Sequence, residues 1–147
     1  MAAEVEFVDI TQYFLAHTGV TLFPHQVSAI KWMQRTERRP RMIAAQPHGG
    51  ILAHAMGLGK TITTLGLVFF EGVGSTIVVC PKSVISQWRE EALRILKLSP
   101  DEIIVYHGGD REKDWRRFSE RKSGRQLVLT TFDIVRMDNE DRVSHSH

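Results

Sequence analysis

The sequence predicts an α/β fold, in which helices flank a mostly parallel sheet of about four strands. Along the 147 residues, segments of strand length alternate four times with segments of helical periodicity. That alternation favours parallel strands joined by right-handed crossovers. The segment 76–80 is an almost continuous β-branched run, which is typical of a strand covered on both faces. In such sheets, ligands bind beyond the carboxyl ends of the strands.

Two helices are expected before the first strand. Residues 9–17 carry several apolar side chains, and Gly19 would end that helix. A second helix begins near Pro24, because proline suits a first helical turn, and runs to about Thr36. The basic segment 35–41 is interrupted by a proline. We interpret it as a solvated loop, with a phosphate-contacting patch as the alternative.

Gln26 lies at the start of the second predicted helix. A glutamine amide can pair with N6 and N7 of adenine, because it presents a donor and an acceptor side by side. A glutamine in a helix is more often simply solvated, so this residue needs the context of a nucleotide site.

The stretch 49–61 supplies that context. It reads Gly-Gly-Ile-Leu-Ala-His-Ala-Met-Gly-Leu-Gly-Lys-Thr. A strand at 51–53, a glycine-rich turn and a buried helix over 62–70 would follow one another here. This is the order of elements in a phosphate-binding P-loop.

Four residues of this stretch carry the expected chemistry. Gly57 and Gly59 would let backbone N–H groups converge on a phosphate at the positive end of the helix. Lys60 would reach the β- and γ-phosphates of ATP, and the Thr61 hydroxyl would bind Mg²⁺. The alternative is an ordinary glycine turn with a solvated lysine.

The second half of the chain continues the alternation. Strands are expected at 76–80, 103–106 and 126–130, and helices at 84–97, 111–122 and 132–137. Acidic and basic residues alternate in 111–122, which favours a solvated face over a DNA-binding one. For the polar tail, 138–147, we expect disorder.

Composition narrows the class of protein. Nineteen Lys and Arg oppose seventeen Asp and Glu, and the net charge of +2 neither requires nor excludes a nucleic-acid partner. Cys80 is the single cysteine, so no internal disulfide and no cysteine metal cluster can form. No apolar run has the length of a signal peptide or a membrane span. We therefore expect an intracellular protein with no membrane partner.

Five short motifs follow one another between residues 22 and 136. They are Leu-Phe-Pro-His-Gln at 22–26 with Trp-Met at 32–33, the stretch 49–61, Val-Val-Cys-Pro-Lys-Ser at 78–83 with Gln-Trp at 87–88, Val-Tyr-His-Gly at 105–108, and Leu-Thr-Thr-Phe at 129–132. In order and spacing they resemble motifs of the Swi/Snf-type chromatin-remodelling ATPases, members of the superfamily-two helicases. The first three resemble the glutamine motif, motif I and motif Ia, and the last lies near motif Ib.

The resemblance implies an incomplete RecA-like lobe of a DNA-dependent ATPase, which turns ATP hydrolysis into translocation along duplex DNA. The lobe would occupy 1–137, with a helical lead-in at 1–41 and the P-loop region at 49–72. Lys82 and Thr131 would lie along the DNA backbone. The family also implies weak double-stranded DNA binding here and a nuclear location, although a cytoplasmic one is not excluded.

By the same carry-over, five residues form the nucleotide site. Gln26 would read adenine, while Gly57, Gly59 and Lys60 cradle the phosphates of ATP and Thr61 holds Mg²⁺.

Two departures from the family pattern limit what the resemblance implies. His54 and Ala55 stand where the family usually has Asp-Glu. No Asp-Glu-x-His run, the family's motif II, follows the last predicted strand. We therefore assign no catalytic residue within this chain and expect no efficient hydrolysis by the chain alone. A second polypeptide could supply motifs II to VI.

Two other functions stay open at this stage. One is a non-catalytic module that binds DNA or a partner protein. The other is a small P-loop kinase or switch in which Asp133 serves as the metal acid. The ordinary role of Asp133 would be to cap the short helix that follows it.

Overall fold

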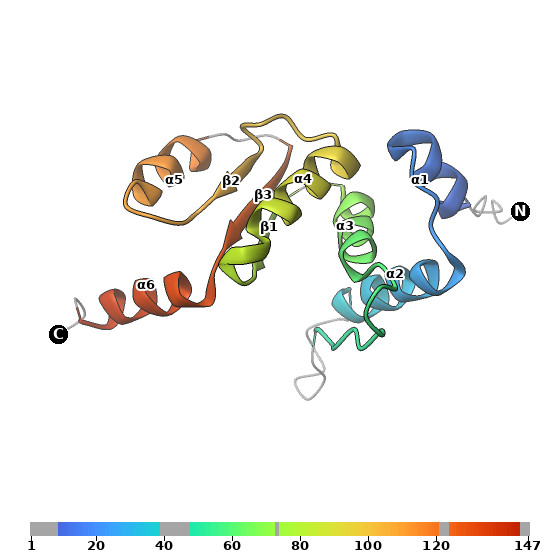
Figure 1. The fold of residues 1–147 in the computed structure, drawn as a ribbon, viewed down its shortest axis with the longest axis horizontal. Helices are drawn as coiled ribbons and strands as arrows, with labels where there is room; N and C mark the ends of the chain where they lie inside the picture. Colours follow the sequence, from blue (N-terminus) through green and yellow to red (C-terminus); the bar gives the residue numbers. More distant parts are fainter. Residues whose placement is uncertain (1–8, 39–47, 73, 121–123, 145–147) are drawn as a thin grey trace, which may run out of the picture. The chain divides into compact units, whose positions relative to one another are not determined.

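The structure, a computed structural model, describes residues 9–38, 48–72, 74–120 and 124–144 (Figure 1). The chain divides into two compact units, Met1–Glu71 and Gly72–His147. The first unit is helical in its described part, and the second holds the sheet.

Unit 1 contains α1 (Ile10–Thr18), α2 (Pro24–Glu37) and α3 (Lys60–Glu71). Asp9 caps α1, because its carboxylate accepts a hydrogen bond from the Thr11 N–H at 3.0 Å. Gly19 ends α1 in the left-handed region, with φ of 73°, and its N–H donates to the Leu15 carbonyl.

The core of unit 1 lies between these helices. Phe14, Ile30 and Leu65, one from each helix, are fully buried. Gly66 lets α3 approach α2 closely, since a Cβ at this position would lie 2.7 Å from Cδ1 of Ile30.

Unit 2 contains a three-stranded parallel sheet and the helices that connect its strands (Figure 1). The strands are β1 (Gly74–Val79), β2 (Ile103–Val105) and β3 (Arg125–Thr130), in the spatial order β1-β3-β2. Between and after them come η1 (Lys82–Val84), α4 (Ile85–Leu96), α5 (Arg111–Ser119) and α6 (Phe132–Ser144).

The sequence predicted burial on both faces for 76–80, but this segment lies mostly in β1, an edge strand of the described sheet, and its Ile77 is 61% exposed. The strand that is buried on both faces is the central one, β3. Leu127 and Leu129 are fully buried, and Val128, which points to the opposite face, packs with Ile104 and Phe118. The parallel α/β class and three predicted strands are therefore confirmed.

One predicted strand does not form. Residues 51–53 have no regular secondary structure, and Ile51 is 88% exposed. A strand exists only through hydrogen bonds to a neighbour, and the described part of unit 1 offers no strand with which 51–53 could pair. The described sheet accordingly has three strands rather than about four.

The predicted disorder of the tail is also wrong for residues 138–144. These residues continue α6, which runs to Ser144. Neither glycine nor proline interrupts the sequence from Phe132 onward, and Asp138 is held by hydrogen bonds from Tyr106 and Arg111. Residues 145–147 lie outside the described part.

No helix within the described ranges is long and apolar enough to cross a membrane.

Candidate functional site

The candidate site in unit 1 is the glycine loop, residues 48–59, together with the first turn of α3. Gly57 and Gly59 have φ angles of 84° and 75°, which are strained for residues that carry a Cβ. The loop leads directly into α3 at Lys60. The first N–H groups of a helix have no partner within the helix, so this end can bind an anion.

The Lys60 ammonium lies within the loop. Its Nζ donates to the His54 carbonyl at 2.8 Å and to the Ala55 carbonyl at 3.1 Å. The predicted magnesium ligand, Thr61, follows it in α3 and is half-buried. The positive charge of Lys60 therefore lies at the loop that leads into the N-terminus of α3.

Gln26 lies against the same loop. Its side chain is 3% exposed. Oε1 accepts from the Phe23 N–H at 2.9 Å, and Nε2 donates to the Leu58 carbonyl at 3.3 Å. A Cβ on Gly59 would overlap with Nε2 of Gln26, so this glycine is required by space as well as by its φ angle.

The structure thus brings together all five residues that the sequence assigned to the nucleotide. They belong to α2, the loop and α3: Gln26, Gly57, Gly59, Lys60 and Thr61. An amide has two N–H donors and two lone pairs on its oxygen. Its two protein contacts use one donor and one lone pair of the Gln26 amide.

Sequence reasoning assigned no role in this site to two histidines, His25 and His54. The ring nitrogen Nε2 of His25 lies 3.0 Å from the Leu58 carbonyl oxygen. The His25 ring stacks on Phe23, with centroids 5.9 Å apart and planes at 7°, and meets the edge of His54 at 5.5 Å and 72°. Nδ1 of His54 is buried and has no hydrogen-bond partner among the described residues. In the sequence, the signal that points to His25 is its position next to Gln26.

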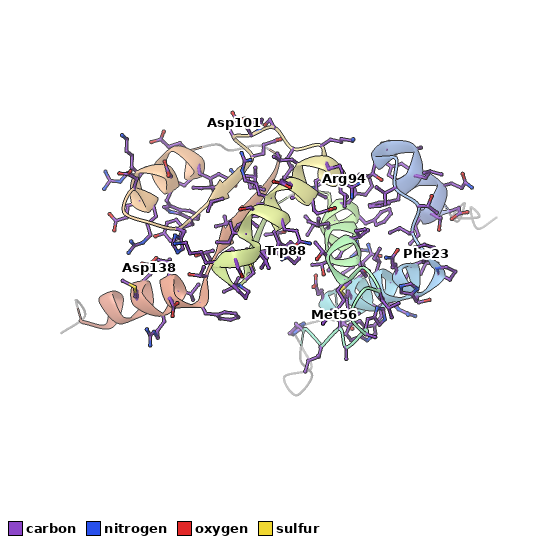
Figure 2. All side chains as sticks on the ribbon, viewed as in Figure 1. Phe23, Met56, Trp88, Arg94, Asp101 and Asp138 are labelled. Carbon is purple, nitrogen blue, oxygen red and sulfur yellow. The ribbon has the colours of Figure 1, made fainter. Side chains whose placement is uncertain are left out.

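Two exposed apolar side chains lie beside the site. Figure 2 labels Phe23, before the first residue of α2, and Met56, in the loop. Their exposed fractions are 61% and 97%, so apolar surface borders the polar loop.

The predicted DNA-contacting residues lie in unit 2, at one edge of the sheet. Lys82 follows β1 and is exposed, while Thr131 directly follows β3. Because Val79 and Thr130 are partners in the parallel ladder, these two strand ends meet at the same edge. Thr131 is 5% exposed, and its hydroxyl accepts from the Ile134 N–H at 3.5 Å, which caps α6. Of these two residues, Lys82 is therefore the exposed one.

Asp133 lies on the first turn of α6, with its side chain 85% exposed and 3.9 Å from the Arg136 guanidinium. An acidic residue there is stabilised by the positive end of the helix. Within the described ranges, no group of three or more His, Cys, Asp or Glu side chains could hold a metal ion.

A polar cluster and a cleft complete unit 2. The Tyr106 hydroxyl donates to Oδ2 of Asp138 at 2.8 Å, and the Arg111 guanidinium donates to Oδ1 at 3.2 Å; Figure 2 labels Asp138 on α6. Burial, and then the contact with Asp138, raise the pKa of Tyr106. A cleft of about 630 Å³ lies beside this cluster. It is lined by Ile77, Tyr106, Glu112, Trp115, Arg116, Val128, Thr130, Val135 and Asp138.

Comparison with known proteins identifies relatives over most of the chain. The family model of the SNF2-related domain matches residues 25–146. A probable global transactivator of Orgyia pseudotsugata multicapsid polyhedrosis virus is 34% identical over 140 residues, covering 88% of this chain and 25% of the relative. A lymphoid-specific helicase of Homo sapiens is 34% identical over 130 residues, covering 82% of this chain and 14% of the relative.

A third relative is a mouse protein, the chromodomain-helicase-DNA-binding protein 1-like of Mus musculus. It is 30% identical over 145 residues, covering 94% of this chain and 15% of the relative. The chain thus spans a quarter or less of the length of these three relatives.

Proposed function

Because the chain belongs to the SNF2-related family, we propose that unit 1 binds Mg-ATP, as the ATP-binding part of a Swi/Snf-type DNA-dependent ATPase. One observation carries the proposal: the Lys60 ammonium lies inside the glycine loop, where α3 begins, on the carbonyls of His54 and Ala55. Such a position matches a charge that exchanges loop carbonyls for phosphate oxygens when a nucleotide arrives.

Each remaining site residue then has a role. The N–H groups around Gly57 and Gly59 and at the start of α3 would bind phosphate oxygens. The Thr61 hydroxyl would bind Mg²⁺, an ion that neutralises charge on the β- and γ-phosphates. Gln26 would pair with adenine through the amide N–H and the oxygen lone pair that its two protein contacts do not use.

For this chain we propose binding of Mg-ATP, and not its hydrolysis. The sequence contains no Asp-Glu-x-His run, and phosphoryl transfer depends on charged groups that position Mg²⁺ and stabilise the transition state. We propose that hydrolysis requires those groups in addition to the residues assigned here to the nucleotide. The kinase alternative has no comparable support, since Asp133 is exposed on α6 and lies near Arg136.

For unit 2 we propose contact with the DNA backbone, and for the whole protein a nuclear location. Lys82 supports the DNA contact, because it is exposed at the carboxyl edge of the sheet. Phosphate contacts of this kind are independent of sequence and weaken with salt. The name of the mouse relative includes both helicase and DNA binding.

Isothermal titration with Mg-ATP tests the proposal. A charge-assisted contact contributes about 1.5–3 kcal/mol, so Lys60→Ala should weaken binding roughly tenfold to hundredfold. Lys113→Ala, a matched charge removal on an exposed residue of α5, should leave the affinity unchanged. Equal affinities of the wild-type protein and Lys60→Ala would refute the assignment of the loop.

A second titration tests whether Gln26 contacts the adenine base. Gln26 also holds the loop, so lower ATP affinity in Gln26→Ala would not by itself show adenine contact. The ratio of ATP to GTP affinity is the specific measure, because one bidentate pair discriminates by about 1–3 kcal/mol. An unchanged ratio would remove Gln26 from the base site.

A further inference from the structure

The glycine loop is held in shape mainly by side chains. No strand precedes it within the described residues, so a β-ladder does not fix its backbone. Four of its carbonyls accept hydrogen bonds from side chains: those of His54 and Ala55 from Lys60, that of Leu58 from α2, and that of Gly59 from Thr63 of α3. Contacts at these carbonyls therefore determine how the loop N–H groups are aimed.

The Leu58 carbonyl is held twice by the first turn of α2. Nε2 of His25 lies at 3.0 Å and Nε2 of Gln26 at 3.3 Å from this oxygen. We call His25, Gln26 and the Leu58 carbonyl the α2 latch. The His25 contact is the shorter one, and the other end of the Gln26 amide is committed to the Phe23 N–H.

The His25 ring is fixed in the orientation that this contact needs. It lies parallel to the ring of Phe23 on one side and against the edge of His54 on another. A carbonyl can only accept, so Nε2 must carry a proton. This condition is met by the Nε2–H tautomer and by the protonated ring alike.

Holding the Leu58 carbonyl also aims a neighbouring donor. In a planar trans peptide, the C=O and the following N–H point in opposite directions. With its carbonyl turned toward α2, the Leu58–Gly59 peptide directs the Gly59 N–H away from α2. This peptide rotates about ψ of Leu58 and φ of Gly59, and the glycine gives it more freedom than a residue with a Cβ would.

We propose that His25 is a positioning residue of the phosphate loop, which acts through the Leu58 carbonyl to aim the Gly59 N–H at the nucleotide. The inference rests on the proposed function for its ligand, and on the α2 latch for its mechanism. It assigns to His25 a role distinct from the base contact proposed for Gln26.

Three variants distinguish the effect of the His25 N–H donor from the effect of its aromatic ring. His25→Phe keeps a flat ring beside Phe23 and His54 but removes the donor, whereas His25→Gln removes the ring and restores an amide donor. His17→Phe is the matched control: His17 lies in α1, is exposed, and contacts the Tyr13 carbonyl of its own helix.

Two measurements on the full chain test the inference. Nitrogen-15 relaxation of the Gly59 amide, with Gly66 as an internal reference, should show greater mobility in His25→Phe and not in His25→Gln or His17→Phe. Affinity for Mg-ATP should fall about two- to tenfold in His25→Phe, the range for one neutral hydrogen bond. It should recover in His25→Gln. Wild-type mobility and affinity in His25→Phe, or equal losses in both His25 variants, would overturn the inference.

A spectrum of the unmutated protein keeps the test decisive if His25→Phe does not fold. Long-range nitrogen-15 correlations should show a proton on Nε2 of His25, and a ring protonated on Nδ1 alone would overturn the inference. Should the wild-type protein bind no Mg-ATP, the proposed function fails, while the Gly59 relaxation still decides whether His25 holds the loop.

Discussion

The contact between Gly59 and Gln26 predicts an unequal response of two glycines in the same loop. Gly57 and Gly59 both have φ in the left-handed region, at 84° and 75°. A Cβ at Gly57 would meet nothing within 4 Å, whereas one at Gly59 would overlap with Nε2 of Gln26. Alanine at either position incurs the left-handed strain, but only Gly59→Ala also displaces Gln26.

The magnitudes follow from these contacts. The left-handed conformation costs an L-residue about 1–2 kcal/mol, which applies to both variants. Gly59→Ala should additionally lose the two Gln26 hydrogen bonds, to Leu58 and Phe23, at about 0.5–1.5 kcal/mol each. The reduced freedom of the unfolded chain is the same in both variants and cancels. We expect Gly59→Ala to be less stable than Gly57→Ala by about 1–3 kcal/mol.

Urea denaturation of the two variants and the wild-type protein measures this difference directly. Circular dichroism reports the loss of helix, and the slope of each transition checks that the unfolded states are comparable. Equal free energies of unfolding for Gly57→Ala and Gly59→Ala would refute the reasoning, because the Gln26 contact would then contribute nothing to stability.

Three further predictions concern unit 2. Tyr106→Phe should lower the free energy of unfolding by about 0.5–1.5 kcal/mol through loss of the hydrogen bond to Asp138. Because the folded-state pKa of Tyr106 is raised from 10.0, this difference should be present below pH 10 and disappear as the pH rises through the folded-state value; urea titrations on both sides of it check the sign. Burial raises the pKa of the Cys80 thiol, so iodoacetamide should react slowly with the native protein and quickly in denaturant, and equal rates would contradict this. Lys82→Ala should reduce the salt dependence of duplex DNA binding by about 0.9 in the log–log slope, and Lys113→Ala should not.

Local patterns in the sequence predicted most of unit 2. The β-branched run at 76–80 and the apolar segments at 103–106 and 126–130 correspond to β1, β2 and β3. Each of these strands finds a parallel neighbour, so its local preference and its long-range pairing agree. The segment 51–53 has a similar apolar character but no described neighbour in unit 1. Its secondary structure therefore could not be predicted from its own residues.

The candidate site likewise contains features that local sequence patterns predict and features that depend on contacts between distant residues. That Gln26, Lys60 and the glycines lie at one loop could be predicted from sequence, because their spacing forms a motif with a known physical use. The contact of His25 could not be predicted, since it joins this residue to the Leu58 carbonyl, 33 positions further along the chain. The end of α6 was missed for a related reason, because Asp138 is anchored by side chains from β2's end and from α5.

The most direct test of the central claim is a nuclear magnetic resonance titration of the nitrogen-15-labelled protein with Mg-ATP. Chemical-shift changes should be saturable and concentrated in the loop and the first turn of α3, at Gly57, Gly59, Lys60 and Thr61, with a further change at the side-chain amide of Gln26. The same titration of Lys60→Ala should require a higher ATP concentration. Absence of saturable shifts at these residues, or shifts confined to unit 2, would contradict the account.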